Sequence, residues 1–118
     1  MYATSNIDFT TYSTSEIKTG QWIDGKNIYC KTINFGSLPS SNTGKRVAHN
    51  ITNLAYVVNW FGMTTYSNDN VIRPLPFVSP SGGNQVNVEF DKTDVIIYAN
   101  SDRSNFSAYI TMYYTKTS

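Results

Sequence analysis

The dipeptide Asp24-Gly25 constrains this chain more than any other feature, because it separates two stretches of strand-forming residues. Both residues tolerate the positive φ angles of a two-residue type I′ hairpin turn. That turn predicts strands near residues 16–23 and 26–35, with Trp22 opposite Asn27. Apolar side chains occur on both faces of the hairpin. We therefore expect the hairpin to be a central part of a β-sheet protein, covered on both sides.

The composition favours one β-rich domain. The 118 residues suffice for a single hydrophobic core, and only 14% of them are charged, against about a quarter in typical proteins. Ser, Thr and Asn together supply 40 residues and Tyr supplies nine, so the polarity comes from hydrogen-bonding groups, as in many proteins that bind sugars or form fibres. The net charge of +1 gives no reason to expect nucleic acid or an anionic membrane as a partner.

The chain offers little for redox chemistry or membrane insertion. Cys30 is the only cysteine, so an intrachain disulfide is excluded, and its place on a strand predicts a small buried hydrophobe. No apolar run has the length of a membrane span, and residues 1–6 do not resemble a signal peptide. If the protein reaches the exterior, we expect it to do so without its own export signal, and a phage virion component released by lysis would fit that description.

The organisation along the chain is predicted as a polar lead-in and one domain. Residues 1–15 read as a linker or stalk junction, which suggests that the natural protein extends further N-terminally. The β-sandwich domain is expected over 16–118. Residues 36–44 are a loop by composition.

Two interpretations compete for residues 47–61. Apolar residues recur there at helical spacing, but three Asn residues and adjacent Val residues lower the helix propensity, and from Tyr56 the pattern also alternates as in a strand. We favour a short strand at 45–48, a turn from Asn50 to Asn53 and a long strand at 55–66.

The remaining segments also predict strands separated by turns. Pro74 and Pro76 place the extended segment Val71 to Val78 at a sheet edge, between a turn at 67–70 and a break at 79–83. Three strands close the chain, at 86–90, 95–98 and 106–115, and in the last of these one face carries Ala108, Ile110, Met112 and Tyr114. About eight strands in total predict an antiparallel β-sandwich, with a jelly roll as one form of it.

The residues provide no recognisable catalytic set. His49 is the only histidine, which excludes His-pair zinc sites, and we expect its ring to bond the backbone. Glu89 and Asp91 point the same way on a strand, as a glycosidase pair would, but such alternation is typical of a solvated face. Residues 68–70 lack the ligand pattern of a calcium loop. We predict no catalytic residue, no metal and no cofactor.

Sugar binding is the remaining chemistry that the residues suggest. Aromatic rings can cover the C–H groups of a sugar while Asn, Asp or Arg bind its hydroxyl groups. Trp60, Tyr66, Tyr98, Tyr109 and Tyr113 are the candidate exposed aromatics, beside polar loops at 67–70 and 100–105. The predicted ligand-binding residues are Trp60, Tyr66, Asn68, Asp69, Asn70, Asn100, Asp102 and Arg103. The alternative is that the aromatics fill the core or a subunit interface.

Three motifs occur in an order that resembles a known family. They are Trp22-Ile23-Asp24-Gly25-Lys26-x-Ile28-Tyr29, Val47-Ala48-His49-x-Ile51-x-Asn53 and Tyr113-Tyr114-Thr115-Lys116-Thr117, preceded by Tyr12-Ser13-Thr14-Ser15-Glu16. Together they resemble the C-terminal domain of phage tail-fibre and related virion appendage proteins, over roughly residues 12–117. The resemblance implies a non-enzymatic β-sandwich at the far end of a fibre, usually trimeric and exposed to the host surface.

We therefore expect a virion protein that forms a homotrimer, follows an upstream fibre shaft and binds host cell-surface polysaccharide. The resemblance itself implies no defined ligand. Two alternatives remain, namely a structural fibre cap or head-fibre domain without a ligand, and a small polysaccharide depolymerase.

Overall fold

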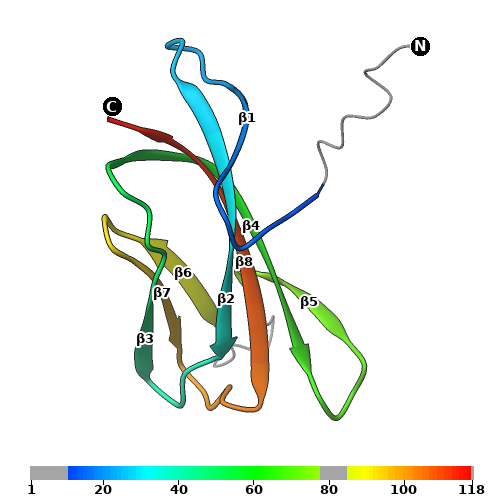
Figure 1. The fold of residues 1–118 in the computed structure, drawn as a ribbon. Helices are drawn as coiled ribbons and strands as arrows, with labels where there is room; N and C mark the ends of the chain where they lie inside the picture. The colour runs from blue at the N-terminus through cyan, green and yellow to red at the C-terminus, as the bar shows by residue number, and fades with distance from the viewer. Residues whose placement is uncertain (1–10, 78–84, 118) are drawn as a thin grey trace, which may run out of the picture.

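The computed structural model describes residues 11–77 and 85–117, which form eight strands and no helix, hence none that could cross a membrane. The strands are β1 (Ile17–Gln21), β2 (Asn27–Ser37), β3 (Thr43–Ala48), β4 (Leu54–Tyr66), β5 (Ile72–Leu75), β6 (Val86–Phe90), β7 (Asp94–Ala99) and β8 (Phe106–Lys116). They make a five-stranded sheet, in the order β1-β2-β8-β4-β5, and a three-stranded sheet, in the order β3-β7-β6, with all neighbours antiparallel (Figure 1). The predicted all-β sandwich is confirmed.

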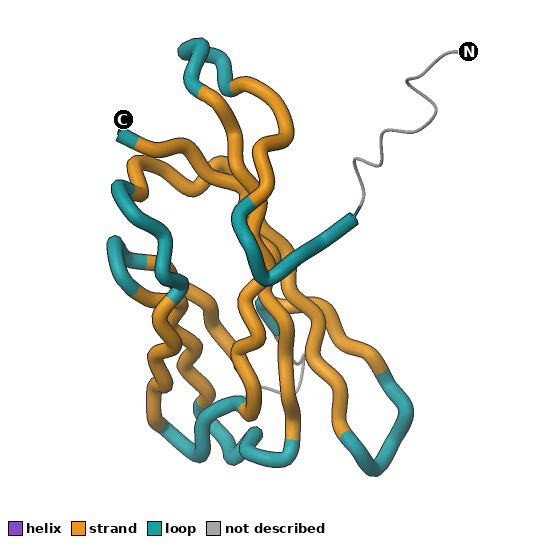
Figure 2. Tube along the Cα trace, in the orientation of Figure 1, coloured by secondary structure: helices purple, strands orange, loops and turns teal. Residues whose placement is uncertain are grey.

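The chain wraps between the sheets in a nested way. β2 pairs with β8 in the larger sheet, and β3, which follows β2, pairs with β7, which precedes β8. Of the four connections between described strands that cross from one layer to the other, β2–β3 and β7–β8 therefore run next to each other, as in a jelly roll (Figure 2).

The core lies between the two layers and follows the side-chain alternation of the strands. In β8 the side chains of Ala108, Ile110, Met112 and Tyr114 are buried, as predicted for this face. From the smaller sheet, Val95 and Ile97 of β7 are fully buried against the same cluster. β8 is the central strand of the larger sheet, between β2 and β4, and its buried face runs along most of its length.

The ambiguous segment 47–61 contains strands and a turn. β3 ends at Ala48, β4 begins at Leu54, and the backbones of Asn50 and Asn53 between them have φ angles of 56° and 59°. Asn tolerates this left-handed conformation better than most residues. The two Asn residues therefore form a turn here instead of continuing a helix. The favoured prediction is confirmed, with β4 starting one residue earlier than expected.

The segment with two prolines is an edge strand, as predicted. β5 pairs only with β4 within the described part of the larger sheet, and Pro74, which has no N–H to donate, is tolerated there. Phe77 then exchanges backbone hydrogen bonds with Val86 and links this edge to the start of β6. The predicted break at 79–83 and residues 1–10 of the predicted linker lie outside the described residues.

The register predicted for the first hairpin is wrong by one residue. The Gly25 N–H donates to the Trp22 carbonyl and the Trp22 N–H donates to the Lys26 carbonyl, so the loop has three residues, 23–25. Gly25 has a positive φ, 88°, as in a type I turn closed by a glycine bulge. Gln21 therefore lies opposite Asn27.

The predicted central place of this hairpin is also wrong. β1 is the edge strand of the larger sheet, and Ile23 at the loop tip is 91% exposed. Trp22 is half-buried, with its ring 6.2 Å from that of Tyr56. The hairpin has apolar side chains on both faces because Trp22 makes this local contact with Tyr56, and no second layer covers the hairpin in the described part of the chain.

Candidate functional site

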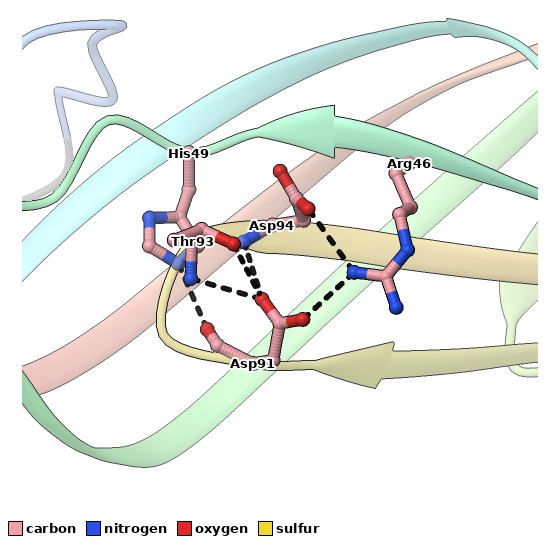
Figure 3. Close-up of polar contacts among 5 residues, drawn as sticks. All are labelled: Arg46, His49, Asp91, Thr93 and Asp94. Atoms are coloured by element: carbon pink, nitrogen blue, oxygen red, sulfur yellow. Dashed lines mark hydrogen bonds and ion pairs between the residues drawn. The ribbon is translucent and has the colours of Figure 1, made fainter.

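Two polar clusters form at opposite ends of β7. The first surrounds His49, just after β3, and the turn between β6 and β7 (Figure 3). The second surrounds Phe106 at the start of β8, which follows the loop 100–105 at the other end of β7.

The His49 ring is part of the fold. Its side chain is buried, with the residue only 1% exposed, and Nδ1 accepts the Ile51 N–H at 3.1 Å. Since Nδ1 supplies a lone pair, the ring proton lies on Nε2, which donates to the Asp91 carbonyl at 3.0 Å. The predicted backbone-bonding role is confirmed, and both ring nitrogens are occupied.

Asp91 organises the neighbouring turn. Its Oδ1 accepts the N–H groups of Thr93 and Asp94, and its Oδ2 lies 2.7 Å from Nη1 of Arg46, which also contacts Asp94 at 3.1 Å (Figure 3). The Arg46 guanidinium first, and then these N–H groups, hold the pKa of Asp91 well below its usual range. The polar groups of this cluster therefore bond one another, and an open hollow of about 390 Å³ beside them is lined by Leu54, Ala55, Tyr56, Val57, Phe90, Asp91 and Lys92.

A pocket of about 220 Å³ lies at the other end. Its walls come from the loop after β2, from β4, β5, β6 and β8, and from the loop before β8. The lining residues are Leu38, Thr64, Arg73, Phe77, Val86, Arg103 and Phe106. Because these segments are distant in sequence, only the assembled sandwich creates the pocket.

Phe106 is the aromatic centre of this site. The ring of Tyr66 stacks on it with centroids 4.7 Å apart and an angle of 15° between the planes. The guanidinium groups of Arg73 and Arg103 lie 5.5 and 5.3 Å from its centroid. Such cation–π contacts hold planar cations against a ring, so both guanidiniums are kept beside the pocket.

The Arg73 guanidinium is only partly satisfied by the chain. Its Nη2 binds Oδ2 of Asp69 at 2.9 Å, whereas Nη1 is buried and has no hydrogen-bond acceptor, the one such buried side-chain atom among the described residues. Asp69 also accepts the Val71 N–H, and Arg73 together with that bond lowers the pKa of Asp69. A buried N–H without an acceptor raises the free energy of the protein, so an acceptor oxygen that bonded Nη1 of Arg73 would stabilise this site.

The structure brings several predicted site residues together here. Tyr66, Asp69 and Arg103 meet around Phe106, and Asn68 donates to the Tyr66 hydroxyl at 3.2 Å. The exposed Asn70 completes the same turn with a φ of 55°.

Other predicted residues lie elsewhere. Trp60 is half-buried and packs edge-on against Phe90, 5.5 Å between centroids, so the prediction that its ring is exposed is wrong. It sits on the inner side of β4, where burying the large ring stabilises the core. Asp102 bonds the Ser104 N–H within its own turn, and its carboxylate is absent from the pocket lining.

Asn100 belongs to a second, shallower hollow of about 270 Å³ at the same end of β7. The hollow lies beside the exposed ring of Tyr98 and is otherwise edged by amides and small residues, namely Asn42, Thr43, Gln85, Asn87, Ala99 and Asn100. The Asn100 side-chain oxygen accepts the Gln85 N–H at 2.7 Å, which orients the amide.

The remaining candidate aromatics lie on the outer face of the larger sheet. Tyr109 is exposed and lies opposite Met63 in the β4–β8 pairing, with Phe61 one step along the same face. The ring of Tyr12 covers Phe61 edge-on at 5.7 Å. Tyr113, half-buried, is further along this face. We call Tyr12, Phe61, Met63 and Tyr109 the outer apolar stripe.

Sequence reasoning missed Arg73 and Phe106. Arg73 was assigned only to an edge strand, yet it shares a side of β5 with the buried Leu75. A charged residue that alternates in phase with buried ones is the signal that could have identified it. The sequence predicts Phe106 only as the first residue of a strand, because no local pattern indicates which distant residues contact its ring.

Among the described residues, no group of three or more His, Cys, Asp and Glu side chains is placed to hold a metal ion. Comparison of the chain with protein-family models, curated proteins and solved structures found no match. The functional inference is therefore made from the residues and their geometry.

Proposed function

We propose that the chain is the non-enzymatic terminal domain of a phage fibre, which trimerises and binds host cell-surface glycan. The observation that carries the proposal is the pocket beside Phe106, where two predicted loops meet at one end of the sandwich. The resemblance of three sequence motifs to those of phage tail-fibre C-terminal domains supports the same assignment.

The pocket has the two kinds of surface that a sugar needs. Leu38, Phe77 and Val86 offer apolar contact, while Arg73 and Arg103 offer planar arrays of hydrogen-bond donors. Sugars present C–H groups on one side and hydroxyl oxygens at the rim, so both surfaces find partners on the same ligand.

The ionisable residues support binding instead of turnover. Both ring nitrogens of His49 are bonded within the fold. In the acid pair considered from the sequence, Asp91 is bound to Arg46, and Glu89 accepts a bond from Asn87 at 3.3 Å. An acid–base pair for glycoside hydrolysis needs carboxyl groups free to face the substrate.

The outer apolar stripe supports association between copies. Phe61, Met63 and Tyr109 are each more than a third exposed, and they lie together on one sheet face. Contiguous exposed apolar side chains of this kind mark interaction surfaces. In a trimer they would meet equivalent residues, and three weak glycan sites would gain avidity.

The first test is a glycan array that includes bacterial surface polysaccharides, probed with the full labelled chain. We expect binding, loss of binding in Phe106→Ala, and retention in Lys18→Gln, which changes an exposed residue on β1. Reducing ends released from a bound polysaccharide would contradict the non-enzymatic assignment, and an array without any bound glycan would contradict the adhesive one.

The second test measures the mass of the native species by analytical ultracentrifugation. We expect the mass of three chains for the unchanged protein. For the double variant Met63→Lys/Tyr109→Lys we expect the mass of one chain, because the positive charges on the stripes of facing copies repel each other. A strict monomer at high concentration would contradict the trimer.

A further inference from the structure

The composition of the pocket indicates which sugars it would take. The described residues that line it include two guanidinium groups and no carboxylate. Asp69 neutralises part of Arg73 from outside the lining, and it does so through Nη2 alone. Asp102 likewise interacts electrostatically with Arg103 from outside the lining, so the surface of the pocket itself carries guanidinium groups while the carboxylates that offset them lie behind it.

The state of Arg73 adds a second, independent observation. Nη2 is held by Asp69 and the guanidinium plane rests near the Phe106 ring, so the group is oriented before any ligand arrives. Nη1, in contrast, is buried with no acceptor. Orienting a donor and leaving it unpaired costs free energy in the unliganded protein, and an anionic ligand oxygen that reached Nη1 would recover it.

A carboxylate matches these features better than a hydroxyl. Hydrogen bonds from a guanidinium to a carboxylate are about twice as strong as neutral ones. The low exposure of Arg73, with 26% of its side chain accessible, limits screening by water and salt. The apolar side chains Leu38 and Val86 in the same lining would cover ring C–H groups or a methyl substituent of the same sugar.

We propose that the ligand bound at the Phe106 pocket is a carboxylate-bearing saccharide, such as a uronic or a sialic acid residue of a surface glycan. This inference rests on the proposed glycan-binding function and specifies the chemical class of its ligand. The neighbouring Tyr98 hollow, with its amide rim, would take neutral parts of the same chain.

The test uses pairs of sugars that differ only in charge. The full chain, labelled with ¹⁵N, is titrated with glucuronic, galacturonic and N-acetylneuraminic acid, and in parallel with the methyl ester of each, and amide shifts near Arg73 and Phe106 are followed. We expect at least one acid to bind at least about tenfold more tightly than its ester, since esterification removes a charge-assisted contact.

Variants locate the effect. Arg73→Gln should lower the affinity for the acid about tenfold and leave the ester unchanged, whereas Lys18→Gln, an equal change of charge on the exposed β1 edge, should alter neither. Arg73→Lys keeps the charge but loses the planar fork, and it replaces Arg73→Gln if that variant does not fold; an intermediate affinity is expected.

Three results would overturn the inference. They are equal binding of acid and ester, shifts confined to residues around Tyr98, and the absence of binding by all three acids. In each case the glycan array tests the proposed function separately. Binding of a neutral polysaccharide on the array would support glycan binding and contradict only the acidic ligand.

Discussion

The two arginine–aspartate clusters at the ends of β7 differ in what they leave available. Near Asp94, the Arg46 guanidinium binds two carboxylates, and the backbone turn is fastened by Asp91. Near Phe106, the Arg73 guanidinium binds a single carboxylate and keeps a buried nitrogen without an acceptor. The first cluster stabilises the fold. In the second, the Arg73 side chain is held in place, but one of its donor groups has no partner.

This difference indicates that one cluster stabilises the fold and that the other is available for binding. His49 and Asp91 join β3 to the β6–β7 turn, so their bonds hold the smaller sheet together. Arg73 and Asp69 lie within one hairpin, β4–β5, at the edge of the larger sheet. An edge can carry an unsatisfied group at little risk to the core.

Replacing His49 should have the largest effect. His49→Ala leaves the Ile51 N–H and the Asp91 carbonyl without their partner and opens a cavity, so we expect a loss of about 2–4 kcal/mol in the free energy of unfolding, measured with urea. Thr52→Ala, at an exposed neighbour, is the control. A loss below about 1 kcal/mol would show that the closed cluster does not stabilise the fold.

The response to acid should separate the two clusters next. The folded-state pKa of Asp91 lies below its unfolded value of about 4, so its stabilising contribution is present above that pH and is lost as the pH falls through the lowered pKa. The pKa of Asp69 is lowered too, but with fewer N–H donors. Between about pH 5 and pH 2, Asp91→Asn should flatten the fall in stability more than Asp69→Asn. Equal slopes in a urea series would contradict the comparison.

Replacing Arg73 should have the smallest effect on stability. Arg73→Gln removes an edge ion pair together with a buried unpaired donor, two changes of opposite sign, so we expect the free energy of unfolding to stay within about 1 kcal/mol of the native value. Thermal and urea unfolding measure it. A larger loss would assign Arg73 to the fold and weaken its role in binding.

Much of the fold could be predicted from local chemistry. The alternation in residues 106–115 identified the buried face of β8, and the Asn residues at 50 and 53 identified the turn before β4. Pro74 and Pro76 identified an edge strand. Each of these conclusions depends on properties that a residue has in any chain, such as its tolerance of positive φ or its missing N–H.

The failures share another cause. The hairpin register depended on whether the turn had two or three residues, and Asp24 without a positive φ selected three. Trp60 could face solvent or core, and the pairing of β4 with β8 placed it inside. Arg73 gained its role only because β5 brought it beside the first residue of β8.

The order of strands and turns, the buried face of β8 and the backbone-bonding role of His49 follow from the sequence alone, since side-chain alternation and turn preferences act over a few residues. The tertiary structure alone decided which loops meet at the pocket, because that depends on pairing β4 and β8, whose paired residues are 40 or more positions apart. Strand pairing over such distances is set by the whole core, and no short motif in the chain encodes it.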